Sequence, residues 1–295
     1  MLDIDPELVA TALERSSDYR VLRRHHPRRL FEHPGDAEIR HGLLIDLETT
    51  GLDPNYHEVI EIGLVPFTYT VDGRLVAAEE PYGSFQQPWG PILPEITRLT
   101  GIDSAMVEGH MIERSRVEAM VERADLIVAH NASFDRPFAE DVCPALKNKP
   151  WGCSLQQVPW AAEGMGSKLS YIASDLGLIF SAHRAVDDCQ ATLECLSRPL
   201  PRSGRTGFSH LLEQAFLPVY RVKAVRAPYE AKDLLKARRY RWDDGSVSQT
   251  RCWFKDLPED EVGLELEWLR REAYRYDANV PIIAIDPCDR FSARV

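Results

Sequence analysis

The alternation of apolar and polar positions predicts a mixed α/β region in the longer, N-terminal part of the chain. Apolar runs typical of buried strands occur at Leu43–Ile45, Val59–Val65 and Leu126–Ala129. The dipeptide Asp72-Gly73 is a hairpin turn signal, so the chain is expected to return as a strand at Leu75–Phe85. These runs therefore predict the strands of one sheet.

Helical spacing of apolar residues accounts for most segments between and after these strands. Helices are predicted at residues 94–99, 114–124, 134–146, 168–176 and 185–196, and a last short strand at residues 151–155. A hairpin followed by strand–helix units indicates an α/β arrangement, a mixed five-stranded sheet flanked by helices.

The flanking segments differ from this region. A helix at residues 6–16 followed by irregular chain predicts an N-terminal helical arm over residues 1–40, and the Pro- and Gly-containing residues 199–206 are typical of a linker. The segment after the linker is predicted to hold helices at 208–216, 231–237 and 258–274, a strand at 220–225 and a hairpin joining 240–242 to 252–255. We therefore expect an α/β domain at residues 41–198 and a small C-terminal α+β module at residues 207–295.

Composition narrows the class of protein. The 295 residues are 44% hydrophobic and 27% charged, as in a soluble globular protein. No apolar run reaches the length of a membrane span, and the acidic segment Met1–Asp5 lacks the basic start of a secretory signal. The six cysteines include no C-x-x-C pair, which argues against a zinc site or a disulfide framework. We expect a cytoplasmic protein with no membrane partner.

Charge is distributed unevenly along the chain. Residues 1–201 contain 18 Lys and Arg against 31 Asp and Glu, whereas residues 202–295 contain 17 against 15. The segment Arg221–Lys255 holds ten basic and four acidic residues, and six arginines lie between Arg15 and Arg29. Basic segments around an acidic centre suit a metal-dependent site that acts on a polyanion. The alternative is that these arginines are ordinary solvated surface.

Candidate chemistry centres on Asp46 and Glu48, which follow the first apolar run. Residues two apart on a strand point to the same face, so both carboxylates enter one small volume. Two buried like charges are costly unless a cation lies between them, and oxygen ligands favour Mg²⁺ or Mn²⁺. The alternative is an exposed acidic pair on an edge strand, since polar alternation is common on antiparallel strands.

Three more polar residues stand where helices are expected to begin. Asp135 follows a buried strand, His183 precedes a helix, and Asp188 lies one turn into that helix. Each has an ordinary explanation by itself, because the helix dipole favours acids near the N-terminus and a loop histidine is commonly a surface residue. Their meaning depends on whether the fold brings them to the first acidic pair.

Together these segments resemble the DEDDh family of 3′→5′ exonucleases, which includes the proofreading subunit of bacterial replicative DNA polymerase. The family's three motifs stand here in order as Asp46–Leu52, His130–Asp135 and His183–Asp188, and the resemblance covers residues 43–197. The histidine four intervening residues before the last acid indicates the His branch of the family.

The resemblance implies a ribonuclease H-like fold and hydrolysis of phosphodiesters to nucleoside 5′-monophosphates by a two-metal-ion mechanism. Asp46 would bridge two divalent cations, Mg²⁺ or Mn²⁺. Glu48 and Asp188 would hold the cation that carries the nucleophilic water, and Asp135 would support the other. His183 would accept the proton of that water, since imidazole is the usual acid–base group near neutral pH. The residues implied to contact the terminal nucleotide are Thr49, Thr50, Gly51, Leu52, Asn131 and Phe134.

Alternatives stay open for the substrate and for the C-terminal module. Single-stranded 3′ ends of DNA are the first expectation, and RNA or short oligoribonucleotides are the alternative, because no stretch reveals how the site treats a 2′-hydroxyl. A non-catalytic, polymerase-associated subunit would have lost a metal ligand, and all of them are intact. In the module, Trp242 and Trp253 lie among arginines and could stack on a single strand, or they could form a small core with Trp268.

Overall fold

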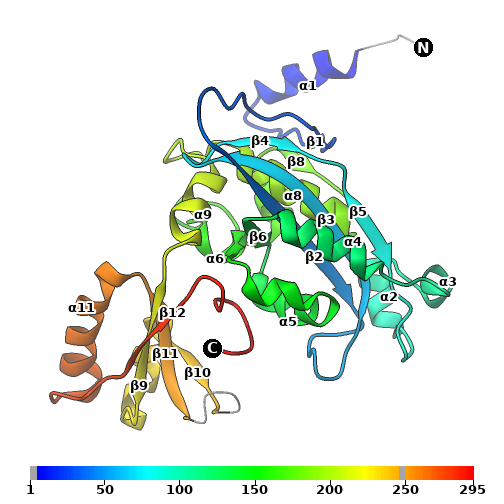
Figure 1. Ribbon diagram of the computed structural model, residues 1–295. Coiled ribbons are helices and arrows are strands. Elements are labelled where there is room, and N and C mark those ends of the chain that lie inside the picture. Colours follow the sequence, from blue (N-terminus) through cyan, green and yellow to red (C-terminus); the bar gives the residue numbers. More distant parts are fainter. Residues whose placement is uncertain (1–4, 246–249) are drawn as a thin grey trace.

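The computed structural model describes residues 5–245 and 250–295, so residues 1–4 of the predicted arm and 246–249 of the predicted module lie outside the described residues. Its larger part is a mixed sheet with helices on both faces, and a smaller antiparallel sheet stands beside it (Figure 1). The expected α/β fold with an additional C-terminal α+β module is confirmed.

Strand β2 (Ile39–Thr49) is the centre of the larger sheet. It pairs antiparallel with β3 (Val59–Thr70) and parallel with β6 (Leu126–Ala129). Strand β7 (Trp151–Cys153) extends the sheet parallel to β6. Because β2, β6 and β7 are parallel, their carboxyl ends meet at the same edge of the sheet, where ligand sites of α/β proteins commonly lie.

The strand predicted at residues 75–85 is instead two strands. Strands β4 (Leu75–Ala78) and β5 (Tyr82–Phe85) pair antiparallel with separate parts of β3. The ladder is interrupted between them, where Pro81 has no N–H to donate. The order across the sheet is β4-β3-β2-β6-β7, with β5 also on β3. The predicted five strand positions are therefore confirmed, with one position split.

Two layers of helices cover the sheet. One layer consists of α4 (Arg114–Arg123) and α5 (Ala132–Val142), and the other of α7 (Leu169–Asp175), α8 (Ala185–Ser197) and α9 (Gly207–Ala215). Side chains of β2 alternate between the layers, since Leu43 and Ile45 lie in the first core and Leu44 in the second. The helix predicted at 134–146 ends at Val142, because Pro144 cannot continue its hydrogen bonds.

Short elements complete this part of the molecule. They are α1 (Pro6–Glu14), β1 (Arg23–Arg24), α2 (Pro94–Thr100), α3 (Ser104–Val107), η1 (Pro144–Asn148), α6 (Ser154–Gln157) and β8 (Leu178–Ile179). Strand β1 pairs with β8, which attaches the N-terminal arm to the domain. Arginines of the arm also form ion pairs, Arg23 with Glu7 and Glu14, and Arg28 with Glu194. The Arg23 pairs join β1 to α1 within the arm, and the Arg28 pair joins the arm to α8, so these two arginines have acidic partners of their own.

The C-terminal module is a four-stranded antiparallel sheet in the order β10-β11-β9-β12. Its strands are β9 (Val219–Val225), β10 (Arg241–Asp243), β11 (Cys252–Leu257) and β12 (Ile282–Ile285), and its helical segments are η2 (Tyr229–Ala231), α10 (Lys232–Ala237), α11 (Glu259–Trp268) and the π-helical η3 (Leu269–Tyr274). Val222 and Ala224 of β9 pack against Leu235 and Leu269 of the helices. Strand β12 was not predicted, because its pairing with β9 is long-range.

Packing moves the expected boundary between the two parts. Residues 199–206 were predicted as a linker, but Pro199 and Thr206 form a β-bridge and Leu200 is buried. Helix α9 then packs into the first domain, where Phe208 contacts the rings of Phe67 and Tyr69. The first core therefore extends through α9 to Ala215, and the second begins with β9.

The described residues contain no helix long and apolar enough to cross a membrane.

Candidate active site

Strand β2 carries two of the predicted ligands to its carboxyl end. Asp46 and Glu48 share the face of β2 on which Leu44 packs beneath α8, as the spacing predicts. Both side chains are partly buried, and they belong to the central strand of the sheet. The alternative of an exposed acidic pair on an edge strand is therefore wrong.

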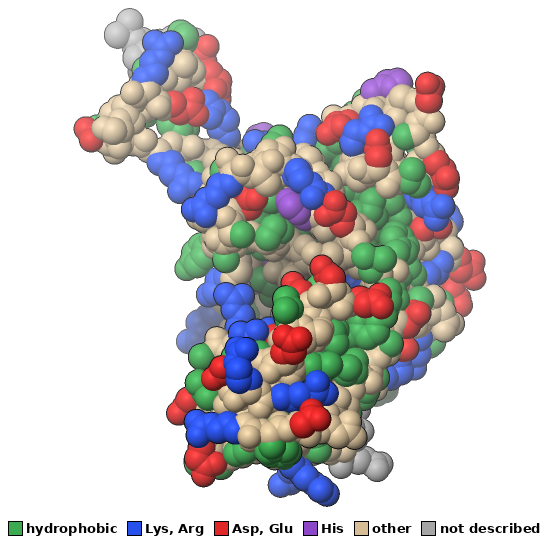
Figure 2. Space-filling model, turned by 90° about the vertical axis from the view of Figure 1, so that its left-hand side faces the viewer, with side chains coloured by type: hydrophobic (Ala, Val, Ile, Leu, Met, Phe, Trp, Pro, Cys, Tyr) green, Lys and Arg blue, Asp and Glu red, His purple; other side chains and the backbone are tan. Residues whose placement is uncertain are grey.

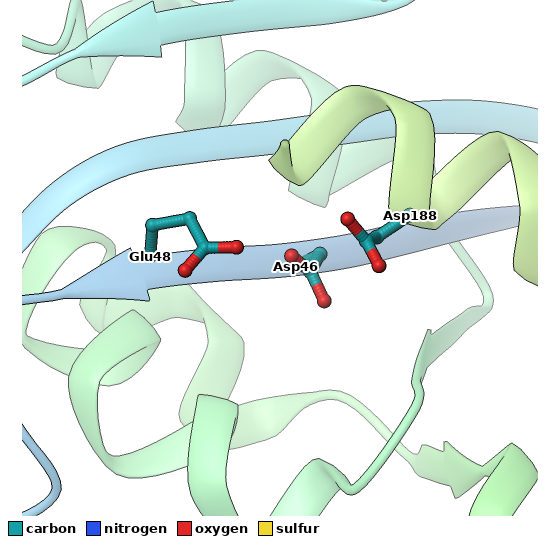
Figure 3. A group of neighbouring side chains, drawn as sticks. All are labelled: Asp46, Glu48 and Asp188. Atoms are coloured by element: carbon teal, nitrogen blue, oxygen red, sulfur yellow. The ribbon is translucent and has the colours of Figure 1, made fainter. Parts of the chain in front are cut away.

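The first turn of α8 brings Asp188 to this pair. Gly63 of β3 stands opposite Asp46, and a Cβ at Gly63 would lie 2.3 Å from the backbone carbon of Ala185. Only glycine lets the helix approach the sheet this closely. Carboxylate oxygens of Asp46, Glu48 and Asp188 consequently lie within 4.8 Å of one another, and Figure 3 shows the three groups in one row.

Asp135 reaches the site from the opposite layer, on the first turn of α5. It is buried, and its Oδ1 accepts a hydrogen bond of 3.1 Å from the backbone N–H of Leu47. Its carboxylate lies outside the close group of three, but it lines the same cleft and is the leading charged neighbour that raises the pKa of Asp46. All four predicted acids therefore meet in one place.

These acids are strongly destabilised in their charged form. Burial, reinforced by the neighbouring carboxylates, holds the pKa of Asp46 well above its usual range, and burial likewise raises that of Asp135. Burial followed by the charge of Asp188 raises the pKa of Glu48 to about 8, and burial raises the pKa of Asp188 to about 6. A set of oxygen donors that repel one another fits a divalent cation, which neutralises them and takes oxygen ligands.

His183 stands at the entrance of the cleft, on the loop before α8. It lines the cleft with the four acids, and its side chain is exposed to solvent. Its φ of 66° is left-handed, a conformation that costs free energy for a residue other than glycine. The next residue, Arg184, donates from its backbone N–H to Asp188 Oδ2 at 2.9 Å. The loop and the metal-ligand candidate are therefore held as one unit.

The acids line a cleft of about 230 Å³. Of the residues implied to contact substrate, Thr49, Gly51, Leu52 and Phe134 line it. The opposite wall comes from α2, through Ile96, Leu99 and Thr100. Leu52 is 82% exposed at the rim, so its apolar side chain is free to meet a ligand.

Thr50 and Asn131 do not line the cleft. The Thr50 hydroxyl accepts a hydrogen bond of 2.9 Å from the backbone N–H of Glu58, which closes the loop after β2. Asn131 caps α5 with a left-handed φ of 74°, and its carbonyl accepts from Phe134 N–H. Thr50 therefore closes the loop after β2, and Asn131 precedes the first turn of α5.

Two residues without a role in the sequence-based prediction support the site. Glu61 of β3 lies opposite Glu48, forms an ion pair with Arg184, and accepts from the N–H of Ala185 at 3.1 Å. The sequence feature that could have identified Glu61 is an acid within an otherwise apolar strand.

His130 lines the cleft and forms a hydrogen bond of 2.8 Å with Ser154 Oγ. Burial lowers the pKa of His130 to about 4, so its side chain is neutral near pH 7.

Comparisons with known proteins agree with this geometry. The sequence model of the RNase T family, described as exonucleases, matches residues 43–196. The PolC-type DNA polymerase III of Thermotoga petrophila is 31% identical over 181 residues, which are 58% of this chain and 13% of that protein. Subunit epsilon of DNA polymerase III from Treponema pallidum is 28% identical over 163 residues, 50% of this chain and 71% of that subunit.

Among solved structures, exonuclease X in complex with 5′ overhanging duplex DNA is 25% identical, with a TM-score of 0.42, and covers 58% of this chain and 98% of that one. The chain spans only a small part of the PolC-type polymerases that it matches. The family match covers more than half of the chain and includes the four clustered acids and His183. The chain therefore belongs to the RNase T family of exonucleases, the DEDD group with its ribonuclease H-like fold.

Proposed function

We propose that this protein is a 3′→5′ exonuclease that hydrolyses DNA from single-stranded 3′ ends and releases nucleoside 5′-monophosphates. The observation that carries the proposal is the convergence of Asp46, Glu48 and Asp188 within 4.8 Å, beside Asp135 and below His183. The choice of DNA rests on the relatives, which are DNA polymerase proteins by name.

Asp46, Glu48, Asp135 and Asp188 would hold two divalent cations, Mg²⁺ or Mn²⁺. When bound, the cations would activate a water molecule and neutralise charge on the leaving 3′ oxygen. Asp46 would serve both cations, because it belongs to the close group of three and Asp135 is its leading charged neighbour. Without cations the four acids resist ionisation together, so occupancy of the site and the charge of its ligands are linked.

His183 would take the proton from the attacking water. Its exposed side chain at the cleft entrance can pass that proton to solvent, which a buried base could not do directly. His130 does not compete for this role, because Ser154 and the Ser167 carbonyl occupy its ring nitrogens.

The walls of the cleft suit a terminal nucleotide. Leu52 and Phe134 on one side and Leu99 on the other present apolar surface against which a base can pack. Thr49 and Gly51 would contact the sugar and phosphate near the acids. Thr50 and Asn131 would contribute through the backbone, since neither residue lines the cleft and the Thr50 hydroxyl is bonded to the loop.

The decisive experiment is digestion of 5′-labelled single-stranded DNA with Mg²⁺, Mn²⁺ or EDTA. A ladder that shortens from the 3′ end, with mononucleotide 5′-phosphates as products and no reaction in EDTA, is the expected result. Asp46→Asn should remove this activity while the far-UV circular dichroism spectrum is unchanged. Hydrolysis by Asp46→Asn at the wild-type rate would contradict the ligand assignment.

RNA and duplex DNA of the same sequence belong in the same experiment. Faster digestion of the oligoribonucleotide than of the DNA would replace DNA by RNA as the substrate and leave the chemistry unchanged.

A further inference from the structure

A groove of about 530 Å³ lies in the C-terminal module, between the end of β9, helix α10 and the paired strands β10 and β11. Its walls combine four cations, Arg226, Lys232, Lys236 and Arg251, with three aromatic rings, Tyr229, Trp242 and Trp253. Among the described residues that line it there is no Asp or Glu. The groove belongs to the module alone and shares no residue with the acidic cleft.

The aromatic rings of the groove are available to a ligand. Tyr229 is 80% exposed and Trp242 is 53% exposed. Trp242 meets Trp253 edge to face, with ring centroids 5.3 Å apart. Trp268 packs elsewhere, stacked on buried Tyr240 at 6.5 Å. Of the alternative core of Trp242, Trp253 and Trp268, Trp253 and Trp268 do pack against the core of the module, whereas Trp242 is left half-exposed.

Three of the four cations in the groove have no ion-pair partner among the described residues, and Lys232 Nζ lies 5.6 Å from the centroid of the Tyr229 ring. Lys232 and Lys236 lie one turn apart on α10, where two like charges weaken a helix. Within the described residues, Arg226, Lys232 and Lys236 form no ion pair, and the neighbouring acids Glu230 and Asp233 do not line the groove. Other cations of the module do have acidic partners, namely Arg221 and Arg241 with Asp256, Arg238 and Lys255 with Glu265, and Lys223 with Asp243.

This pairing refines the meaning of the basic segment at residues 221–255. Five of its ten cations form ion pairs with acids of the module, and four of the other five, Arg226, Lys232, Lys236 and Arg251, line the groove. Figure 2 looks onto the module, in the lower part of the view, and shows Lys and Arg side chains along its margin and underside. The charge of the groove therefore complements a polyanion.

We propose that the groove binds single-stranded nucleic acid, with bases stacked on Tyr229 and Trp242 and phosphates held by Arg226, Lys232 and Lys236. Cations that follow a backbone beside aromatic rings are the common design of proteins that bind single strands. Double-stranded nucleic acid fits the groove less well, because its bases are already stacked on one another. An acidic peptide also fits less well, because it lacks a series of planar rings that could stack on the aromatic side chains. The inference rests on the proposed function, because the strand held here is the substrate whose 3′ end enters the acidic cleft.

The test compares two variants of the full chain that lose the same charge. The groove variant is Arg226→Gln/Lys232→Gln/Lys236→Gln. The control variant is Arg239→Gln/Arg271→Gln/Arg275→Gln, three exposed cations of the same module outside the groove. Binding of a 5′-fluorescent oligothymidylate of about 30 nucleotides is measured by anisotropy in EDTA, where hydrolysis is blocked, over a range of salt concentrations. An oligouridylate of equal length tests whether the strand is DNA or RNA.

The groove variant is expected to bind about tenfold more weakly than the wild type or worse, and the control variant within about twofold. The slope of log K against log salt should fall by about 2 in the groove variant only, at about 0.7 for each lost phosphate contact on a single strand. Trp242→Ala, a change at a half-exposed ring, should weaken binding by about tenfold with little change in salt dependence. Equal effects of the two triple variants would overturn the proposal, as would a wild type that binds neither strand in EDTA.

Hydrolysis of a thymidine dinucleotide separates this proposal from the proposed function. The groove variant should cleave the dinucleotide at the wild-type rate, because the acidic cleft is complete without the groove. If the wild type binds the long strand through the groove yet cleaves neither substrate with Mg²⁺ or Mn²⁺, the proposed nuclease function is wrong. Binding of single-stranded nucleic acid by the groove would then still be supported. If both substrates are cleaved but the groove variant digests and binds the long strand like the wild type, the groove proposal fails alone.

Discussion

Arg184 and Glu61 form an ion pair, 2.9 Å between Nη2 and Oε1, that ties the loop before α8 to the strand beside β2. Glu61 accepts a second hydrogen bond from the backbone N–H of Ala185, the first residue of α8. One carboxylate thus fixes both the loop that carries His183 and the turn that carries Asp188. The relationship makes Glu61 a positioning residue, with no direct contact to the proposed substrate.

Variants of Glu61 and Arg184 should distinguish the contribution of the Ala185 hydrogen bond from that of the Arg184 ion pair. Glu61→Ala leaves the buried N–H of Ala185 without an acceptor and should cost about 1–3 kcal/mol of stability. Arg184→Ala should also lower stability, because it leaves the buried Glu61 carboxylate without its cation while the bond to Ala185 N–H remains. In both variants kcat should fall more than KM rises, since the change acts on the placement of Asp188 and His183. Thermal unfolding and steady-state kinetics on DNA measure the two effects.

Glu61→Gln provides the control for that prediction. The amide keeps an acceptor for Ala185 N–H and removes the charge, so stability should recover while kcat stays partly reduced. A Glu61→Gln variant as unstable as Glu61→Ala would show that the charge, not the hydrogen bond, holds the start of α8.

Stability of the metal-free protein should fall as the pH rises from about 4 to about 8. Carboxyl groups in the unfolded chain titrate near pH 4, whereas burial raises the pKa of Asp188 to about 6 and that of Glu48 to about 8. The folded state therefore binds more protons than the unfolded state in this range, and raising the pH favours unfolding. Melting temperatures in EDTA across this range measure the effect.

Glu48→Gln should flatten that pH dependence and raise the melting temperature at pH 8, because it removes one of the titrating groups. Glu95→Gln, at an exposed acid of α2, should leave the curve unchanged. Addition of Mg²⁺ should raise the melting temperature of the wild type at pH 8 more than at pH 5, since bound cations compete with protons for the same oxygens. A wild-type curve that rises with pH in EDTA would contradict the electrostatic description of the site.

His183→Ala should lower kcat on DNA by about two to four orders of magnitude, the usual cost of losing a general base. Binding of Mn²⁺ should survive, because His183 has no role as a ligand in the proposed mechanism. His26→Ala, an exposed histidine of the N-terminal arm, is the control and should behave like the wild type. A His183→Ala variant with the kcat of the wild type would remove this residue from the mechanism.

The metal-ligand candidates could be predicted from the sequence because their placement depends on local rules. The spacing of Asp46 and Glu48 on a strand decides their shared face, and the motifs around Asp135 and Asp188 place each acid on the first turn of a helix. Glu61 was missed because its role depends on contacts with residues more than a hundred positions away. The role of the Thr50 hydroxyl could not be predicted either, since its hydrogen bond with the backbone N–H of Glu58 depends on how the loop after β2 closes.

The elements that escaped prediction are those that depend on distant partners. Strands β1 and β8 have two residues each and exist only through their mutual pairing. The supposed linker shows that composition can mislead, since prolines and a glycine at residues 199–206 form a tight, bridged turn instead of an open connection. Periodicity correctly predicted a helix after that turn, but it could not indicate which of two cores the apolar face of the helix enters.

Phe208→Ala tests the assignment of α9 to the first domain. Phe208 is fully buried against the rings of Phe67 and Tyr69, so removing its ring should cost about 3–5 kcal/mol and lower the melting temperature by about 10 °C. Phe216→Ala makes the same change just beyond the helix, at a ring that is 43% exposed, and should cost much less. Because α8 and α9 pack on the same core, the loss in Phe208→Ala should extend to the acidic cleft, where dinucleotide hydrolysis would fail at a lower temperature than in the wild type. Equal and small losses in both variants would place α9 outside the core and restore the boundary at residues 199–206.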